Sequence, residues 1–178
     1  IFRTKARYRV SWRATKQAHL FEQARAFVPP RAAVLEVGCG TGQFAECLAE
    51  QCQASYLGLD FSGEAIRQAI KHCPKMCFEC RDVTTNPPAF DGWDLVVALE
   101  VLEHLPDDLA FLRMLPAGMP MVVSLPTFGG PGHFRHFKTP LSVVTYYTDV
   151  LTFSRLDSVD NPARPGTFPW LLGQAMRS

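Results

Sequence analysis

Short apolar runs alternate with amphipathic segments along most of the chain. Runs at 34–37, 55–59, 76–80 and 119–125, and a turn followed by a run within 91–99, predict buried strands. Segments with helical spacing lie between them, at 43–53, 62–70, 107–115 and 141–149. Strands alternating with helices predict an α/β fold with a mainly parallel sheet. Runs at 151–159 and 168–176, connected by 161–166, predict two further strands.

The N-terminal residues combine basic and apolar side chains. Leu20, Phe21 and Ala24 recur at helical spacing, and Pro29-Pro30 is expected to end this helix before the first strand. Residues 1–16 carry basic side chains and no acidic one. We interpret them as a solvated helix face, with a phosphate-facing arm as the alternative.

Length and charge narrow the class of protein. A chain of 178 residues with a formal net charge of +1 suits one α/β domain and makes no case for binding nucleic acid or acidic membrane. No apolar run approaches the ~20 residues of a membrane span. The six cysteines fall within helix and strand patterns, which favours reduced thiols and a cytoplasmic location. Because the sequence begins at Ile1, a preceding targeting segment stays open.

The segment 34–45, VLEVGCGTGQFA, carries the strongest chemical signal. Gly38, Gly40 and Gly42 separate a strand from a helix, so the backbone can turn tightly and approach a ligand closely. The free N–H groups of the following helix face the same space. Glu36, near the end of the strand, would repel a pyrophosphate and favour a cationic ligand.

This segment resembles motif I of the class I S-adenosylmethionine (SAM) methyltransferases, whose form is close to V-L-E/D-x-G-C-G-x-G. The resemblance implies SAM as cofactor and S-adenosylhomocysteine (SAH) as product. In that family the glycine turn, here Gly38, Cys39, Gly40 and Gly42, underlies the amino-acid end of the cofactor. The acidic residue, here Glu36, helps to hold the ammonium group. A dinucleotide site is disfavoured because GCGTG lacks the third glycine of that fingerprint.

Two further carboxylates follow the next two predicted strands. Asp60 lies about 20 residues past the glycines, where a carboxylate is well placed to accept hydrogen bonds from ribose hydroxyls. Arg81-Asp82-Val83 resembles the adenine-binding segment of the family. The expected cofactor residues therefore include Asp60 with its neighbour Phe61, and Asp82 with Val83. The alternative is that each Asp only ends a strand or forms a turn.

The region WDLVVALEVLEHLPD, at 93–107, resembles small-molecule methyltransferases related to the ubiquinone-biosynthesis O-methyltransferases. The resemblance implies a Rossmann-like, doubly wound seven-stranded sheet in the order 3-2-1-4-5-7-6, with strand 7 antiparallel and helices on both faces. Ligands meet at the carboxyl ends of adjacent strands, so Leu99 and Glu100 are expected at the cofactor. Glu103 and His104 form the ionisable pair beside them, and His104 could take a proton from an acceptor hydroxyl. The alternative is a partly structural role, because E-V-L-E-H recurs in family members of diverse chemistry.

The loop 127–140, TFGGPGHFRHFKTP, is the least generic part of the chain. A similar H-x-R-x-F segment follows the fifth strand in many relatives, next to the acceptor pocket. We therefore expect His133 as a general base and Arg135 as an anion clamp, with the alternative that the loop only caps the sheet. By the same resemblance Tyr8 and Trp12 are candidates for a lid, with core packing as the alternative.

Two patterns raise the question of a metal. Glu100, Glu103 and His104 on one helical turn, with His133 or His136, resemble the divalent-metal set of small-RNA 3′-terminal 2′-O-methyltransferases. The later segments of those enzymes are not evident in this sequence, so the interpretation assigns no metal.

The cysteines form the second pattern. Cys73, Cys77 and Cys80 have the spacing of the radical SAM enzymes. Cys77 and Cys80 flank a predicted strand, however, and side chains three positions apart on a strand point to opposite faces, so the three thiols are not expected to converge on a cluster.

We therefore predict a single methyltransferase domain at 1–178, with a helical lid or cap at 1–29 and a catalytic core at 30–178. Its expected reaction moves the sulfonium methyl of SAM to an oxygen, or in second place a nitrogen, of a small-molecule acceptor. A SAM-binding protein without transferase activity and an RNA-directed methyltransferase are the alternatives, although the charge balance disfavours nucleic acid. The oligomeric state stays open.

Overall fold

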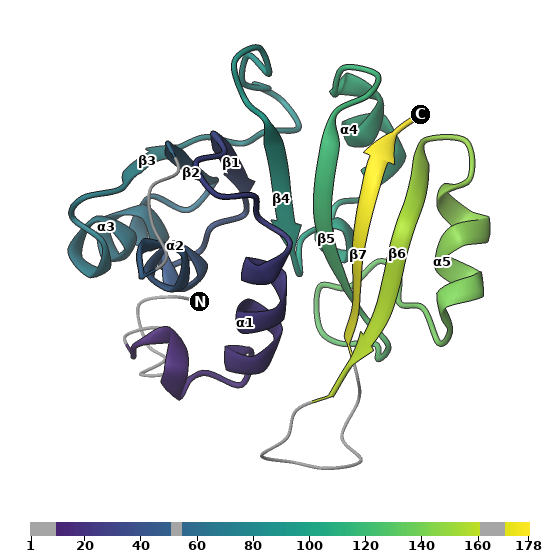
Figure 1. The fold of residues 1–178 in the computed structure, drawn as a ribbon, viewed down its shortest axis with the longest axis horizontal. Coiled ribbons are helices and arrows are strands. Elements are labelled where there is room, and N and C mark those ends of the chain that lie inside the picture. The colour runs from purple at the N-terminus through teal and green to yellow at the C-terminus, as the bar shows by residue number, and fades with distance from the viewer. Residues whose placement is uncertain (1–9, 51–54, 161–169) are drawn as a thin grey trace.

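In the computed structural model, residues 10–50, 55–160 and 170–178 are described. Their centre is a seven-stranded sheet in the order β3-β2-β1-β4-β5-β7-β6 (Figure 1). Strands β1 to β5 pair in parallel, and β7 runs antiparallel to β5 and β6. This topology confirms the expected fold class. The strands are β1 (Val34–Val37), β2 (Tyr56–Asp60), β3 (Cys77–Cys80), β4 (Leu95–Leu99), β5 (Pro120–Pro126), β6 (Leu151–Val159) and β7 (Trp170–Arg177).

The helices occupy the segments that the periodicity predicts. Ser62 caps α3 (Gly63–His72) by accepting a hydrogen bond from the N–H of Ala65. The last helix begins one residue early because Thr139 caps it and Pro140 occupies its first position. The helices are α1 (Ala18–Ala26), α2 (Gln43–Ala49), α3 (Gly63–His72), α4 (Asp108–Met114) and α5 (Pro140–Tyr147), with short 3₁₀ turns η2 (Trp12–Ala14) and η3 (Leu102–His104). The end of the helix expected at 43–53 and the connection expected at 161–166 lie outside the described residues.

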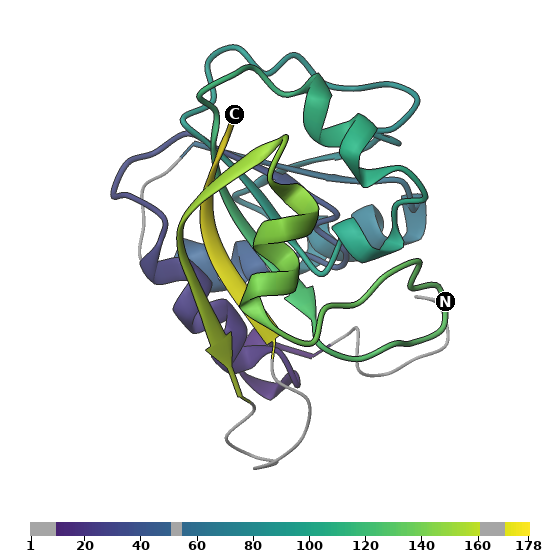
Figure 2. The ribbon, with the colours of Figure 1, turned by 90° about the vertical axis from the view of Figure 1, so that its right-hand side faces the viewer.

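The sheet separates two apolar cores. Leu35 and Val37 of β1 join one core, which is completed by side chains of α4 and α5, including Phe111 and Tyr147. Val34 joins the other core, which is completed by side chains of α1 and α2. Successive residues of a strand point to opposite faces, so the neighbours Val34 and Leu35 are buried against different helices. Figure 2 views the sheet from the side of α5.

The N-terminal segment is anchored to α2. The side chain of Trp12 is buried, and its Nε1 donates a hydrogen bond to Glu50 at 3.0 Å. The backbone N–H of Trp12 donates to Glu46 at 2.8 Å, and Arg13 forms an ion pair with Glu50. The structure thus favours core packing over a lid role for Trp12, while Tyr8 lies outside the described residues. Among the described helices, none has the length and apolar character needed to cross a membrane.

Candidate active site

The glycine turn after β1 has a left-handed backbone at each of its three glycines. The φ angles of Gly38, Gly40 and Gly42 are +69°, +53° and +79°. A Cβ atom on Gly38 would lie 2.4 Å from a methyl carbon of Val101, so glycine is required there for space as well as for conformation. A Cβ on Gly40 would meet no heavy atom of the described residues within 4 Å. The turn therefore presents open space at Gly40, while at Gly38 it is closely packed.

Asp60 lies at the carboxyl end of β2, as expected, and ties this strand to the glycine turn. Its Oδ2 accepts a hydrogen bond from the N–H of Gly40 at 3.0 Å, and its Oδ1 accepts one from Ser62 at 2.8 Å. Burial raises the pKa of Asp60, and the two backbone donors oppose this shift. Each carboxylate oxygen has a second lone pair, so the group can accept further bonds from ligand hydroxyls.

Glu36 is buried beside the glycine turn and has a partner that the sequence analysis missed. The hydroxyl of Tyr56, at the start of β2, donates a hydrogen bond to Oε2 of Glu36. Burial raises the pKa of Glu36 to about 8, and the bond from Tyr56 opposes that rise. No local sequence signal joins residues 36 and 56, because their contact depends on how β1 and β2 pair.

The segment after β3 forms a compact turn. Asp82 accepts hydrogen bonds at Oδ1 from both the N–H and the hydroxyl of Thr84, at 2.9 and 2.6 Å, and these bonds lower the pKa of Asp82. Val83 is buried and Asp82 is exposed. Phe61 exposes 76% of its surface directly after Asp60. The bond from the N–H of Arg81 to the carbonyl oxygen of Asp60 brings the segment 81–83 next to the segment 60–61. A role of these segments in binding adenine stays a prediction.

The position of Glu100 differs from the one that the sequence suggested. It does not share a helical turn with Glu103 and His104, because its φ of +57° turns the chain between β4 and η3. Its carboxylate accepts hydrogen bonds from the hydroxyl of Ser124 at 3.1 Å and from Trp170 Nε1 at 2.9 Å. Burial raises the pKa of Glu100. The side chain therefore joins the ends of β4, β5 and β7. The metal set that the sequence suggested as an alternative, with Glu100 as one ligand, is not assembled.

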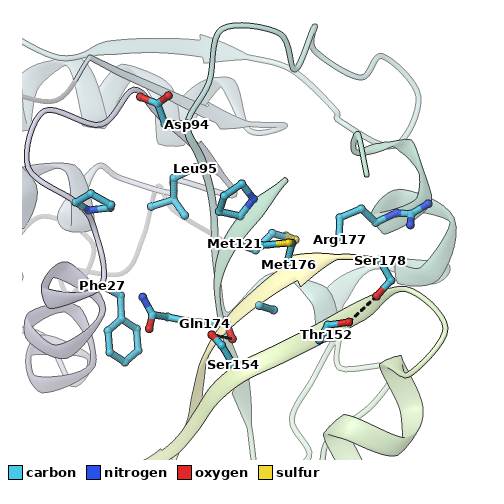
Figure 3. Close-up of a pocket in the computed structure, with 13 residues that line it drawn as sticks. Phe27, Asp94, Leu95, Met121, Thr152, Ser154, Gln174, Met176, Arg177 and Ser178 are labelled. Carbon is cyan, nitrogen blue, oxygen red and sulfur yellow. Dashed lines mark hydrogen bonds between the residues drawn. The ribbon is translucent and has the colours of Figure 1, made fainter. Parts of the chain in front are cut away.

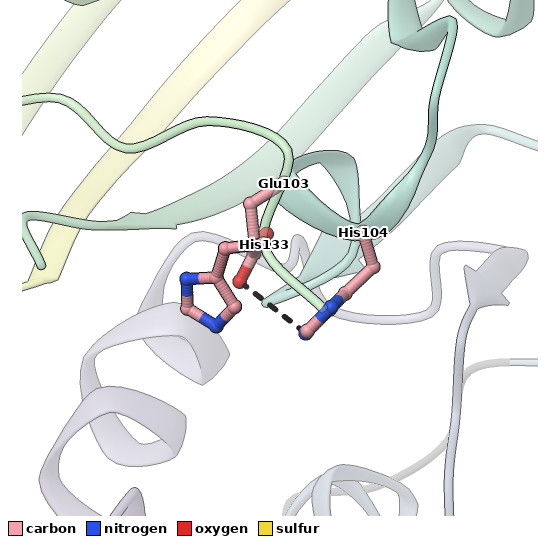
Figure 4. A group of neighbouring side chains, drawn as sticks. All are labelled: Glu103, His104 and His133. Carbon is pink, nitrogen blue, oxygen red and sulfur yellow. Dashed lines mark ion pairs between the residues drawn. The ribbon is translucent and has the colours of Figure 1, made fainter. Parts of the chain in front are cut away.

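Glu103, His104 and His133 do come together (Figure 4). One ligand atom from each lies within 4.8 Å of the others, and the two imidazole centroids are 4.8 Å apart. Glu103 is fully buried, and within the described parts of the chain neither of its carboxylate oxygens has a hydrogen-bond partner. Burial, and then the charge of Glu100, raise the pKa of Glu103. Oε1 of Glu103 lies 3.9 Å from Nε2 of His104, within ion-pair distance but beyond a hydrogen bond (Figure 4). A buried acid without a hydrogen bond is costly, which marks this cluster as a candidate for function.

Backbone carbonyls orient both imidazoles. His104 Nδ1 lies 2.9 Å from the carbonyl oxygen of Gly132, and His133 Nδ1 lies 3.3 Å from that of Phe128. A carbonyl only accepts, so each Nδ1 carries the proton and each Nε2 keeps a free lone pair. Burial, followed by the neighbouring His104, lowers the pKa of His133, which keeps its imidazole neutral. Both rings can thus accept a proton or bind a cation.

Arg135 holds the loop in place and does not present a free cation. Its guanidinium donates to the carbonyl oxygens of Leu102, Leu105 and Pro106 at 2.6 to 2.9 Å, and its Nη1 lies 3.2 Å from Oδ2 of Asp108. The expectation of an anion clamp is therefore not supported. These bonds fasten the loop that carries His133 onto η3, which carries Glu103 and His104.

A separate cavity of about 420 Å³ lies where the parallel strands begin, at the end of the sheet opposite to the glycine turn (Figure 3). Its lining includes Leu95 and Pro120, the first residues of β4 and β5, and Arg177, the last residue of the antiparallel β7. The carboxyl ends of β1 to β5 lie at the other end of the sheet. The cavity is thus distant from the glycine turn and from the histidine cluster.

Comparison with known proteins indicates which part of the chain resembles a known family. Residues 34–116 match a family described as a methyltransferase domain. Trans-aconitate 2-methyltransferase from Afipia carboxidovorans is 34% identical over 89 residues, which are 49% of this chain and 34% of that protein. Ubiquinone biosynthesis O-methyltransferase from Neisseria meningitidis serogroup C is 31% identical over 88 residues, or 45% of this chain and 36% of that protein. The matched part thus spans about a third of the length of these relatives.

Solved structures resemble a larger share of the fold. The N-methyltransferase NodS from Bradyrhizobium japonicum WM9, in complex with SAH, has a TM-score of 0.67 at 22% identity and covers 91% of this chain and 86% of its own. Magnesium protoporphyrin IX methyltransferase from Synechocystis PCC 6803, with bound SAH, has a TM-score of 0.67 at 18% identity, covering 92% and 84%. At these identities the likeness establishes the fold.

Proposed function

We propose that this chain, whose residues 34–116 match a family described as a methyltransferase domain, transfers the methyl group of SAM to a small-molecule acceptor. The observation that carries the proposal is the open space at Gly40 in the glycine turn. The N–H of Gly40 itself donates a hydrogen bond to Asp60. The buried carboxyl of Glu36 adjoins the same turn. Two acidic groups beside an uncovered backbone fit a ligand with ribose hydroxyls and an ammonium group.

The residues of the chain would mainly place the reactants. SAM supplies an activated methyl group on its sulfonium, so the protein has to align donor and acceptor and exclude water. The glycine turn allows close approach of the backbone, Asp60 accepts from ribose hydroxyls, and Glu36 receives the ammonium group. The acceptor would lie near η3, where β4 and β5 end next to each other.

Proton removal falls to the histidine cluster. His104 and His133 each present a free Nε2 lone pair, because their Nδ1 atoms are engaged by backbone carbonyls. A neutral imidazole can accept the proton that an acceptor hydroxyl loses as it is methylated. This favours O-methylation, with N-methylation second. The relatives named for trans-aconitate and for ubiquinone biosynthesis support a small-molecule acceptor.

The same three side chains also fit a divalent cation, since one carboxyl group and two imidazoles form a common donor set. Such a cation would lower the pKa of an acceptor hydroxyl. Dialysis against EDTA separates the two roles. Full turnover after dialysis supports the imidazoles as bases, whereas a loss of turnover that added Mg²⁺ or Zn²⁺ restores would assign them to a metal.

The first test is titration of the protein with SAH. We expect binding to the wild type, and Asp60→Asn should weaken it about 10- to 100-fold, the loss for a hydrogen bond to a charged group. Asp94→Asn is the matched control, because Asp94 also accepts a backbone N–H, from Ala33 at 2.8 Å, but at the opposite edge of the sheet. Absence of SAH binding to the wild type would contradict the proposed function.

A second assay separates transfer from binding alone. Labelled SAM is incubated with a panel of small hydroxylated and amino compounds, and transfer to any of them supports a methyltransferase. SAH binding without transfer to any compound would instead favour a SAM-binding protein that lacks the activity.

A further inference from the structure

Tyr56 is placed so that its hydroxyl reaches across from β2 to β1. It lies at the first position of β2, opposite Val34 in the parallel register, and its hydroxyl donates to Glu36 two residues further along β1. Both side chains are buried, with 6% and 3% of their surface exposed. A buried phenol needs a partner for its hydroxyl, so the Tyr56 ring and the Glu36 carboxyl restrict each other.

The residues around the pair are arranged to admit this contact. A Cβ atom on Gly58 would lie 2.7 Å from the Tyr56 hydroxyl and 2.8 Å from the ring of Phe78, so only glycine leaves room for both. Phe78 packs edge-on against Tyr56, with ring centroids 5.7 Å apart. The contact between Tyr56 and Glu36 therefore depends on the packing of Phe78 against the phenol ring and on glycine at position 58.

No cation balances the Glu36 carboxyl within the described part of the chain. The groups that act on its ionisation are Tyr56 and Asp60, both of β2. Glu36 in turn acts on the thiols of Cys39 in the glycine turn and Cys73 after α3. None of these groups carries a positive charge. A buried carboxylate is stable only when paired, so Glu36 lacks the partner that the ammonium group of a ligand would supply.

We propose that Tyr56 is a positioning residue whose hydroxyl holds the Glu36 carboxyl in place to receive the ammonium group of the cofactor. This inference rests on the proposed function, because it assumes that the ligand of the glycine turn carries an amino acid. The phenol fixes one carboxylate oxygen and leaves the other for the ligand. It also stabilises the negative charge that the ammonium group requires, since a hydrogen bond donated to a carboxylate favours its ionised form.

Two ligands test this role, SAH and 5′-methylthioadenosine, which lacks the amino-acid end. In Tyr56→Phe the ring and its packing remain and only the hydroxyl is lost. We expect SAH affinity to fall about tenfold, as for one hydrogen bond to a charged group, while 5′-methylthioadenosine affinity stays unchanged. Equal losses for both ligands would indicate a merely structural role, and no loss for either would also overturn the inference.

A double-mutant cycle adds a second readout. Glu36→Gln should weaken SAH selectively in the same way, and adding Tyr56→Phe to it should have little further effect, because coupled residues are non-additive. Additive losses would contradict the inference. Should Tyr56→Phe fail to fold, selective loss of SAH in Glu36→Gln still supports the ammonium contact, and an equal loss of both ligands refutes it. If the wild type bound neither ligand, the proposed function itself would fail.

Discussion

Gly38 and Gly40 have the same type of backbone conformation but different surroundings, and so different consequences on substitution. At Gly38 a methyl group would overlap Val101, whereas at Gly40 it would enter open space. We expect Gly38→Ala to lower the free energy of unfolding by roughly 2–4 kcal/mol, from overpacking and left-handed strain together. Gly40→Ala carries only the strain, about 1 kcal/mol, but its methyl group would occupy the space assigned to the cofactor.

Urea denaturation and SAH titration of both variants check this contrast. In Gly40→Ala the loss of free energy of SAH binding should be much larger than the loss of free energy of unfolding. A Gly40→Ala variant that binds SAH like the wild type would place the ligand elsewhere.

His133 allows a prediction for the chemical step. Loss of a general base typically lowers the rate about 10²- to 10⁴-fold, so His133→Ala should reduce kcat within this range while SAH affinity is retained. His136→Ala is the matched control, because His136 belongs to the same loop but is exposed and stands outside the cluster. Equal effects of the two variants on kcat would argue against His133 as the base.

At the scale of elements, the loop 127–140 and η3 behave as one unit. The N–H of Phe134 donates to the carbonyl oxygen of Glu103 at 2.7 Å, and the carbonyl oxygen of Gly132 holds His104. Arg135 adds three carbonyl contacts and the buried ion pair with Asp108. The histidine cluster therefore depends on contacts between two segments about 30 residues apart.

Arg135→Ala should break this unit. Removing one partner of a buried ion pair costs about 3–5 kcal/mol, so we expect a comparable loss in the free energy of unfolding, measured by urea denaturation, and a fall in kcat. Arg67→Ala is the contrast, since Arg67 pairs with Glu64 on an exposed helix face, where such pairs contribute about 0.5 kcal/mol or less. Similar losses in the two variants would contradict the assigned role of Arg135.

At the scale of the whole molecule, buried acids make stability depend on pH. The pKa of Glu36 in the folded state is about 8, well above its usual value of about 4.3. The folded state therefore holds this proton over a range where the unfolded state has lost it. Stability from this group is complete below about pH 4.3 and is lost as the pH rises through about 8.

The ligand-free protein should accordingly become less stable between pH 5 and pH 8, by up to about 1.4 kcal/mol per pH unit for a single such group. Urea denaturation of the wild type and of Glu36→Gln at several pH values isolates the contribution, because the amide does not titrate. The slope should be flatter in the variant. An unchanged slope would mean that Glu36 is not protonated in the folded state.

Local sequence patterns determined most of the fold and part of the site. Each strand and helix lies where its spacing of apolar residues predicts, because the periods of 2 and 3.6 are properties of a single segment. The glycines of 38–42 and the carboxylate of Asp60 were identifiable for the same reason, since a strand-end turn has a local residue pattern. The strand order came from the resemblance of residues 34–45 and 93–107 to a family.

Tertiary structure alone decided which side chains meet. Glu36 finds Tyr56 through strand pairing, and Glu100 bonds to Trp170, 70 residues away, instead of joining Glu103. Arg135 was expected at the acceptor but is held by backbone carbonyls of η3 and the residues after it. Such partners depend on strand register and on the path of the loops, and neither is encoded in the periodicity of any one segment.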